Sequence, residues 1–447
     1  MSEHGFIRRN AMSNKRPNII MIMSDDLGYE CIGVNGGTSY ATPRLDAMAA
    51  NGMRFDEGHV LPLCTPTRVA LMTGKHNFRN YIGFGLVRPD EVTFGHIFSD
   101  AGYNTCISGK WQLYSYNPPE QFPEMRSKGQ RIEDAGFDEF NVWHAHHTEE
   151  KGSRYKDPVI YRNGSYRDDT EGEYGDDLFC DYIIDFIERK KDDDDPFFVY
   201  WPMALTHGPF EPTPDSREWD EFEPRSNKTL GGRTWADLND SGEGAHPRFY
   251  KDMVEYHDKV IGRLLDYLDG QGLSEDTLVI YTGDNGSPQE VCSVMHRHNE
   301  ICGGKGKTND QGTHVPLIVQ MPGTVPAGVV NSDLIDVTDF LPTMLEAAGI
   351  EEPEDYVIDG KSFHPQLRGE MGNPKEWLFF HFMPMSPNVP VDTIRFVRDR
   401  DWKLYETGEL YDLKADLDEE LPIFESDDGE ESAAARARLE TVFEQMV

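Results

Sequence analysis

NIIMIMSDD, residues 18–26, sets an uninterrupted apolar run directly before a serine and two aspartates. Such a run is typical of a buried strand in a parallel sheet, because helices cover both faces of that sheet. Four similar runs follow along the chain: YNTCIS (103–108), FFVYWPM (197–203), LVIYTG (278–283) and PLIVQM (316–321). The run at 18–23 therefore predicts the first strand of a mostly parallel sheet.

Longer amphipathic segments separate these runs, among them PRLDAMAANG, YGDDLFCDYIIDFIERKK and RFYKDMVEYHDKVIGRLLDYLDGQG. The last predicts a helix that stops at Gly270. Its apolar face consists of Met253, Tyr256, Val260, Leu264 and Leu268. Alternation of strands and helices predicts an α/β fold, a mixed and mostly parallel central sheet flanked by helices. In such folds, sites form just beyond the carboxyl ends of the strands.

The pattern changes after about residue 350. EWLFFHF, TIRFVRDRDWKLYE and GELYDL predict three strands of a smaller antiparallel sheet, and SAAARARLETVFEQMV predicts a closing helix. We therefore expect three parts: an N-terminal tail (1–16), an α/β domain (17–350) and a C-terminal α+β subdomain (351–447).

Composition limits the classes of function. The 447 residues carry a formal net charge of −37, which disfavours a nucleic-acid partner and requires a local positive site for any anionic substrate. The apolar runs are too short to span a bilayer or to form a secretory signal, so we expect no membrane partner and a cytoplasmic location. The six cysteines show no metal-binding spacing, and six free thiols are expected.

Oxygen donors follow two of the predicted strands. Asp25 and Asp26 come after the first run, and Asp284 and Asn285 come after LVIYTG. If these strands are neighbours, the four side chains converge, and hard oxygen ligands suit calcium or magnesium. Two unrelated turns are the alternative, because Asp-Asp and Asp-Asn-Gly are common in turns.

Basic groups follow other runs. Lys110 lies in SGKW, His207 in ALTHGP and Lys305 in the glycine-rich stretch CGGKGK. Singly, each would be an ordinary surface lysine or loop histidine. Together they would surround a metal with positive charge and hydrogen-bond donors, which suits an oxyanion ester.

LCTPTR, residues 63–68, contains a cysteine two residues before a proline. Pro66 is tolerated at a first helical position and could open a helix over TRVALMTG. Cys64 would then lie at the helix N-terminus, where backbone N–H groups favour anions, and Arg68 would follow one turn later. The alternative is a buried cysteine before a helix.

CTPTR resembles the C-x-P-x-R motif of the type I sulfatases in the alkaline phosphatase superfamily, and further motifs resemble this family in the same order. They are PNIIMIMSDDLGY, TPRLDAMAANGMRF, SGKW, LTHGPF, YTGDNG, GGKGKTNDQGTHVPLIVQMPG and RDRDWKLYETGELYDL. The resemblance covers residues 16 to 420 and implies a sulfuric ester hydrolase acting on a sulfated carbohydrate or an aryl sulfate.

The resemblance also implies roles for individual residues. Asp25, Asp26, Asp284 and Asn285 would bind a divalent cation, calcium in most of the family, with magnesium as the alternative. A maturation enzyme would oxidise Cys64 to formylglycine, whose hydrate attacks sulfur with one hydroxyl and ejects sulfate by collapse of the other. Arg68 would steady the hydrate, Lys110 and Lys305 would bind sulfate oxygens, and His207 would assist the leaving group.

GKWQLY departs from the family, which often has GKWHLG. Gln112 replaces the histidine and could still bind substrate, but glutamine carries no charge and shuttles no proton at neutral pH. Compensating groups could come from His144, His146 and His147, or from His296, Arg297 and His298; the alternative for both segments is a variable loop at the pocket mouth.

Two other functions are compatible with these motifs. A phosphonate monoester or phosphodiester hydrolase would share the fold, the metal and formylglycine. An unmodified, non-catalytic metal-binding homologue would keep Cys64 as a thiol.

Overall fold

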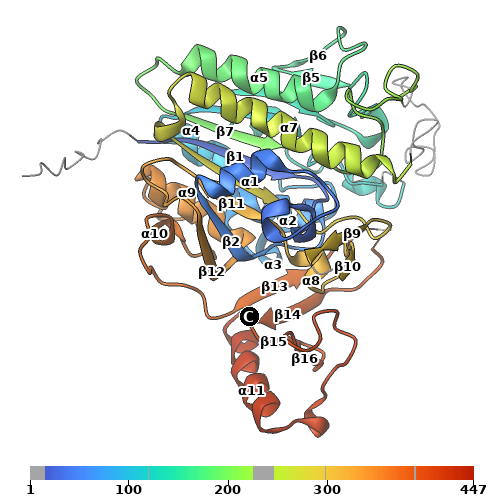
Figure 1. Cartoon of the computed structure of the whole chain (residues 1–447), viewed down its shortest axis with the longest axis vertical. Coiled ribbons are helices and arrows are strands. Elements are labelled where there is room, and N and C mark those ends of the chain that lie inside the picture. The colour runs from blue at the N-terminus through green and yellow to red at the C-terminus, as the bar shows by residue number, and fades with distance from the viewer. Residues whose placement is uncertain (1–15, 119, 225–245, 297–298, 387–388, 447) are drawn as a thin grey trace, which may run out of the picture.

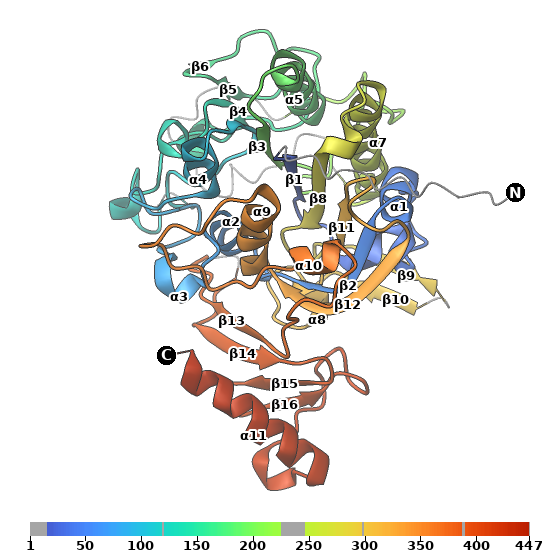
Figure 2. The same ribbon diagram turned by 90° about the vertical axis from the view of Figure 1, so that its left-hand side faces the viewer.

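The computed structural model describes residues 16–118, 120–224, 246–296, 299–386 and 389–446. Its larger part is a ten-stranded sheet with helices on both faces (Figure 1). Its smaller part is a four-stranded antiparallel sheet with one helix packed against it (Figure 2). Residues 1–15 of the expected N-terminal tail lie outside the described residues.

The large sheet is mixed, as predicted. Its strands are β1 (Asn18–Ser24), β2 (Met53–His59), β3 (Asn104–Lys110), β4 (Glu139–Trp143), β5 (Ile160–Arg162), β6 (Ser165–Tyr166), β7 (Phe197–Pro202), β8 (Thr277–Gly283), β11 (Leu317–Gln320) and β12 (Val329–Asp336). They are arranged in the order β12-β2-β11-β8-β1-β7-β3-β4-β5-β6. Neighbours from β8 to β4 are parallel, whereas β11, the strand predicted at 316–321, runs antiparallel to both β8 and β2.

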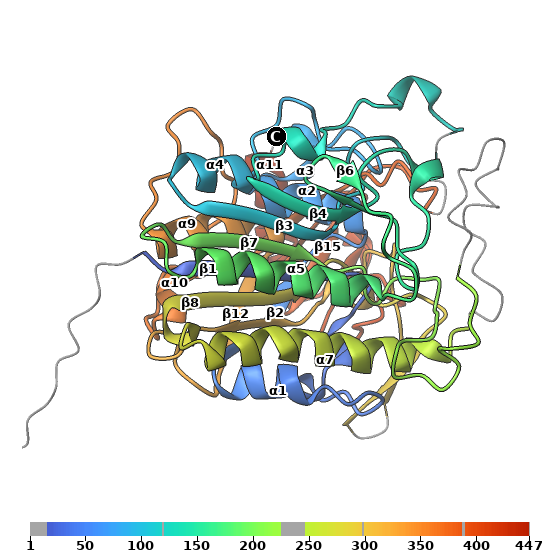
Figure 3. The same ribbon diagram turned by 90° about the horizontal axis from the view of Figure 1, so that it is seen from above.

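Two layers of helices bury the two faces of this sheet (Figure 3). One layer contains α1 (Pro43–Ala50), α5 (Gly175–Lys190) and α7 (Phe249–Gly270), and the other contains α2 (Cys64–Thr73), α4 (Phe94–Asp100) and α9 (Phe340–Ala348). Short helices are α3 (Asn77–Asn80), α8 (Asp310–Thr313) and α10 (His364–Leu367). The predicted apolar face of α7 is buried, and the helix ends at Gly270 as predicted. Among all described residues, no helix is both long and apolar enough to cross a membrane.

The central strand β1 explains why its sequence is apolar throughout. Ile20 and Ile22 pack into the layer of α5 and α7, whereas Ile19, Met21 and Met23 pack into the layer of α2 and α9. Because successive side chains point to opposite faces, only a strand covered on both sides needs an unbroken apolar run.

The small sheet has four strands, so the prediction of three was wrong. They are β13 (Leu378–Phe382), β14 (Ile394–Arg398), β15 (Trp402–Tyr405) and β16 (Leu410–Asp412), with α11 (Glu430–Gln445) packed against them. The stretch TIRFVRDRDWKLYE folds back on itself at Asp399. Its carboxylate accepts hydrogen bonds from the backbone N–H groups of Asp401 and Trp402, at 2.9 and 2.8 Å. A short side chain that bonds to the backbone two residues on makes a tight turn.

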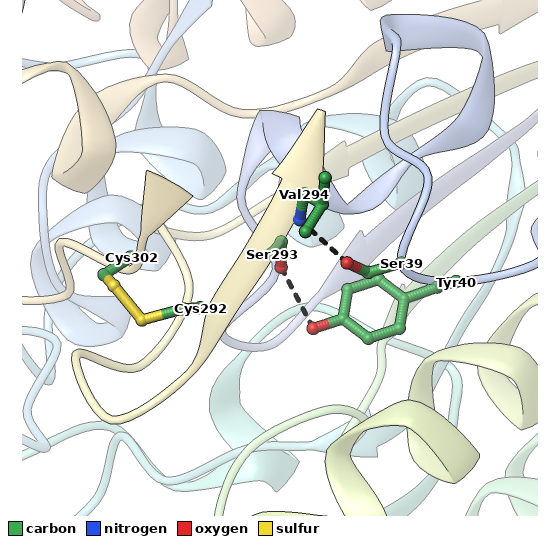
Figure 4. The surroundings of a disulfide bond; sticks show 6 residues. All are labelled: Ser39, Tyr40, Cys292, Ser293, Val294 and Cys302. Carbon is green, nitrogen blue, oxygen red and sulfur yellow. Dashed lines mark hydrogen bonds between the residues drawn. A yellow bond between two sulfur atoms is a disulfide. The ribbon is translucent and has the colours of Figure 1, made fainter. Parts of the chain in front are cut away.

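The expectation of six free thiols was also wrong. Cys292 and Cys302 face each other across the hairpin of β9 (Cys292–Met295) and β10 (Asn299–Cys302) and form a disulfide. The hairpin is held to the large domain where Ser39 and Tyr40 contact Val294 and Ser293 (Figure 4). The other four cysteines are free and buried.

One buried arginine ties the small sheet to the large one. Arg398, at the end of β14, is 4% exposed, and its guanidinium lies 3.2 Å from a carboxylate oxygen of Glu57 on β2 and 3.2 Å from one of Asp310 on α8. Its removal would leave both carboxylates without this partner in a poorly solvated place.

We expect Arg398→Ala to lower the free energy of unfolding in urea by about 3 kcal/mol, as removal of one partner of a buried ion pair does. Arg400→Ala is the matched control, because Arg400 is half-exposed and only 3.5 Å from Asp333. The control should change stability by about 0.5 kcal/mol or less. Equal, small effects of both variants would show that the buried pair does not hold the sheets together.

Candidate active site

A cluster of carboxylates lies at the carboxyl ends of β1 and β8. These strands pair in parallel with Ser24 opposite Gly283, so the residues that follow them meet. The backbone N–H of Asp26 donates to Oδ1 of Asp284 at 3.0 Å, and Nδ2 of Asn285 donates to Oδ1 of Asp26 at 2.8 Å. Asp25 completes the cluster, and all four side chains are buried. The structure thus brings together the four oxygen donors that the sequence predicted as one group.

This cluster fits a divalent cation. Oδ1 of Asp25 and Oδ1 of Asn285 are buried and have no hydrogen-bond partner. Carboxylate oxygens of Asp25 and Asp284 also lie within 4.8 Å of each other and of the Cys64 sulfur. Unpaired buried oxygens are costly, and a cation that prefers oxygen ligands would satisfy them.

The electrostatics of the cluster also favour a cation. Burial, reinforced by the charge of Asp25, raises the pKa of Asp284 to about 7, and burial likewise raises the pKa of Asp26. Burial acts in the same direction on Asp25, but the charge of Lys110 outweighs it with help from neighbouring cations and holds that pKa well below its usual range. A bound cation would supply the charge needed to keep all three carboxylates ionised.

Cys64 and Arg68 reach the cluster from α2. This helix begins at Cys64, two residues before the predicted start at Pro66. Pro66 is tolerated within the first turn because the N–H group it lacks would have no partner inside the helix. Nε of Arg68 donates to Oδ2 of Asp284 at 2.9 Å, while Nη1 of Arg68 is buried without a partner. Burial raises the pKa of the Cys64 thiol, so the residue is a poor thiolate nucleophile as it stands.

Three further predicted residues converge on the same carboxylates. Lys110, the last residue of β3, donates to Oδ2 of Asp25 at 2.7 Å, and Lys305 donates to Oδ2 of Asp26 at 2.5 Å. Nε2 of His207, in the loop after β7, lies 3.8 Å from the same Asp26 oxygen. Burial and then the charge of Lys305 hold the pKa of His207 well below its usual range, so its imidazole is neutral at neutral pH.

A cavity of about 680 Å³ opens over this cluster. Of the predicted residues, Asp26, Gln112, His207 and Lys305 line it. The sequence analysis missed several others, among them Phe84, Asn117, Lys151, Arg154, His246 and Glu290. Lys151 and Arg154 follow β4 at the same edge of the sheet, so the rule that sites form beyond strand ends could have found them.

The histidines proposed to compensate for Gln112 have other partners. His144 is buried beside Thr148, while ring nitrogens of His146 and His147 bond to Tyr166 and Ser115. His296 is exposed, and Arg297 and His298 lie outside the described residues. None of the four described histidines lines the cavity; the imidazole that does so, besides His207, is His246.

Comparison with known proteins agrees with this geometry. Residues 17–350 match the family model of the sulfatases, and residues 305–445 match that of the C-terminal region of N-sulphoglucosamine sulphohydrolase. N-acetylgalactosamine-6-sulfatase of Mus musculus is 31% identical over 392 residues, which cover 79% of this chain and 67% of the mouse protein. Arylsulfatase A of Homo sapiens is 30% identical over 420 residues, covering 85% of this chain and 72% of the human protein.

Solved structures share the fold. A protein bound to its substrate D-glucosamine-2-N,6-O-disulfate superposes with a TM-score of 0.72 at 24% identity, covering 97% of each chain. The phosphonate monoester hydrolase of Agrobacterium radiobacter superposes with a TM-score of 0.67 at 19% identity, covering 97% of this chain and 96% of its own. The family model spans more than half of the chain, and the chain therefore belongs to the sulfatases, the formylglycine-type sulfuric ester hydrolases of the alkaline phosphatase superfamily.

Proposed function

We propose that this sulfatase cleaves a sulfate monoester carried by a sugar, at the base of the cavity above the acidic cluster. The observation that carries the proposal is the convergence of Lys110, Lys305 and Cys64 on buried carboxylates. A sulfate monoester is an anion that repels nucleophiles, and this arrangement would neutralise its oxygens. Relatives named as sulfatases of N-acetylgalactosamine and N-acetylglucosamine support a sugar as the carrier.

Asp25, Asp26, Asp284 and Asn285 would hold the metal ion, calcium by preference and magnesium as the alternative. The oxygen-only donor set and its two unpaired buried oxygens support this assignment. When bound, such an ion polarises the oxygens of the sulfate group.

Cys64 would be the precursor of formylglycine. When hydrated, this aldehyde supplies a hydroxyl nucleophile and a second hydroxyl whose collapse releases sulfate. Cys64 is 2% exposed, so a maturation enzyme would have to reach it before the chain has folded. That enzyme would be a transient partner of the unfolded chain.

The remaining groups would bind and orient the substrate. Lys110 and Lys305 would take the sulfate oxygens, and the unpartnered Nη1 of Arg68 would hold a hydroxyl on residue 64. His207 would donate a proton to the leaving oxygen. Burial and the charge of Lys305 lower the pKa of its imidazole. The negative charge of a bound sulfate would oppose Lys305 and raise that pKa, which favours the protonated imidazole that proton donation requires.

Gln112 lines the cavity and can offer hydrogen bonds to the substrate but no charge.

Turnover of 4-nitrophenyl sulfate against 4-nitrophenyl phenylphosphonate tests the reaction class directly. Faster turnover of the phosphonate would favour the phosphonate hydrolase alternative, and no turnover of either would favour a non-catalytic metal-binding protein.

The first prediction concerns the metal. We expect Asp284→Asn, which removes a charge and keeps the shape, to lose both bound divalent metal and sulfatase activity. Elemental analysis of the purified protein and turnover of 4-nitrophenyl sulfate measure the two effects. Asp339→Asn is the matched control, because Asp339 is equally buried but pairs with Lys375 in a cluster that does not line the cavity. Full activity of the wild-type protein after thorough chelation would contradict the assignment.

A second prediction concerns the two lysines. Lys110→Met and Lys305→Met should each lower kcat/KM by at least about 100-fold, because each removes charge stabilisation of about 3 kcal/mol from the transition state. Lys307→Met is the matched control: this lysine is exposed in the same glycine-rich loop, and the variant should keep wild-type kinetics. Wild-type kcat/KM in both test variants would identify Lys110 and Lys305 as structural.

The third prediction concerns Cys64. Mass spectrometry of the peptide that spans residue 64 should find formylglycine, and activity should follow the modified fraction rather than total protein. Cys64→Ala should be folded and inactive, whereas Cys180→Ala, at a buried free cysteine of α5, should keep the specific activity of the modified enzyme. Full activity in a preparation that carries only the unmodified thiol would disprove the mechanism.

A further inference from the structure

The cavity contains a second cationic position besides the one assigned to the sulfate. Lys151 and Arg154 follow β4, and both line the same cavity as His207 and Lys305. They are 5% and 7% exposed, which is unusual for side chains of this length and charge. Neither holds the acidic cluster, whose cationic partners are Arg68, Lys110 and Lys305.

Arg154 is held in place without a carboxylate. The central carbon of its guanidinium lies 4.2 Å from the centre of a Trp143 ring, a distance typical of a cation–π contact. Nη1 of Arg154 is buried and has no hydrogen-bond partner. No carboxylate among the described residues forms an ion pair with Arg154. A buried guanidinium nitrogen without a partner is costly, and an oxyanion bound in the cavity would satisfy it.

A second cation approaches the same tryptophan. The ammonium of Lys151 is 5.9 Å from the centre of a ring of the same Trp143, so the two positive charges approach one indole. Arg154 and His207 line the same cavity. The second position therefore opens into the same space as the residue proposed to assist the leaving group.

The charge balance of the cavity indicates what binds there. Two of its lining residues are acidic, Asp26 and Glu290, and Asp26 is already paired with Lys305. Arg154, with its unpartnered Nη1, thus brings positive charge to the cavity of a chain whose net charge is −37. A neutral sugar ring would not need this charge, whereas a second anionic group on the substrate would.

We propose that Arg154, with Lys151 in the same cavity, binds a second oxyanion of the substrate. The substrate would then be a sugar with two anionic groups: the sulfate ester that is cleaved, and a carboxylate or second sulfate that remains. The planar fork of a guanidinium can donate two parallel hydrogen bonds to either group. This inference rests on the proposed function, because it places the cleaved sulfate at the acidic cluster.

Binding to a protein that cannot turn over separates the inference from catalysis. Titration calorimetry on Cys64→Ala protein, with and without Arg154→Gln, would use three probes. They are N-acetylglucosamine 6-sulfate (one anion), glucosamine 2-N,6-O-disulfate (two sulfates) and a disaccharide of glucuronic acid and N-acetylglucosamine 6-sulfate (a sulfate and a carboxylate). We expect Arg154→Gln to raise Kd at least about tenfold for one or both two-anion probes, because a charged hydrogen bond is lost. The rise for the one-anion probe should be several-fold smaller.

Two further variants test whether a loss of affinity comes from a distorted pocket and not from the lost charge. Arg162→Gln is the matched control, because Arg162 stacks over Tyr182 at 4.8 Å but does not line the cavity. It should leave all three Kd values unchanged. Arg154→Lys keeps the charge and should recover part of the lost affinity, whereas a misfolded pocket would not recover.

The outcomes are distinct. A larger loss for the disulfate identifies the second group as sulfate, and a larger loss for the disaccharide identifies it as carboxylate. Equal changes for all three probes, no change, or no binding of any two-anion probe to the Arg154-containing protein would overturn the inference. If Kd depends on Arg154 as expected but the wild-type enzyme hydrolyses no sulfate ester, the proposed function fails and the second anion position stands.

Discussion

Burial of three carboxylates at the ends of two adjacent strands is the constraint on which the rest of the molecule depends. Asp25, Asp26 and Asp284 are buried and repel one another, and uncompensated charges there would be very costly. Three cations from three different segments form ion pairs with these carboxylates: Arg68 from α2, Lys110 from β3 and Lys305 from the loop after β10. The same ion pairs therefore stabilise the buried strand ends and place the charged groups of the active site.

Several cationic residues line the cavity, although the molecule as a whole is strongly negative. A net charge of −37 repels anionic sugars at long range, and salt screens such repulsion beyond about 10 Å. Within that distance the substrate would meet Lys305, Arg154 and Lys151, so we propose that these residues, and not the net charge, give selectivity for sulfated substrates. Gln112 lines the same cavity as a neutral group that can form hydrogen bonds, and the positive charge of the cavity comes from Lys151, Arg154 and Lys305.

The small C-terminal sheet contributes to the pocket as well as to the fold. Ser386 and Val389, in the segment between β13 and β14, line the cavity together with residues that come from the large domain. Arg398 fixes the position of this sheet through Glu57 and Asp310, so the pocket shape depends on an ion pair that is not part of the site. A change in the small sheet can therefore alter substrate binding without touching the acidic cluster.

The sequence by itself determined the central strands, the helix at 249–270 and the identity of the residues that meet at the acidic cluster. Apolar runs and helical periodicity are local patterns, and the polar residues that follow each apolar run can be read directly from the sequence. Only the tertiary structure decided the pairing of Cys292 with Cys302, the antiparallel direction of β11, the fourth strand of the small sheet and the presence of Arg154 in the pocket. Each of these depends on which distant or folded-back segments become neighbours, and a local pattern of apolar and polar residues does not encode that choice.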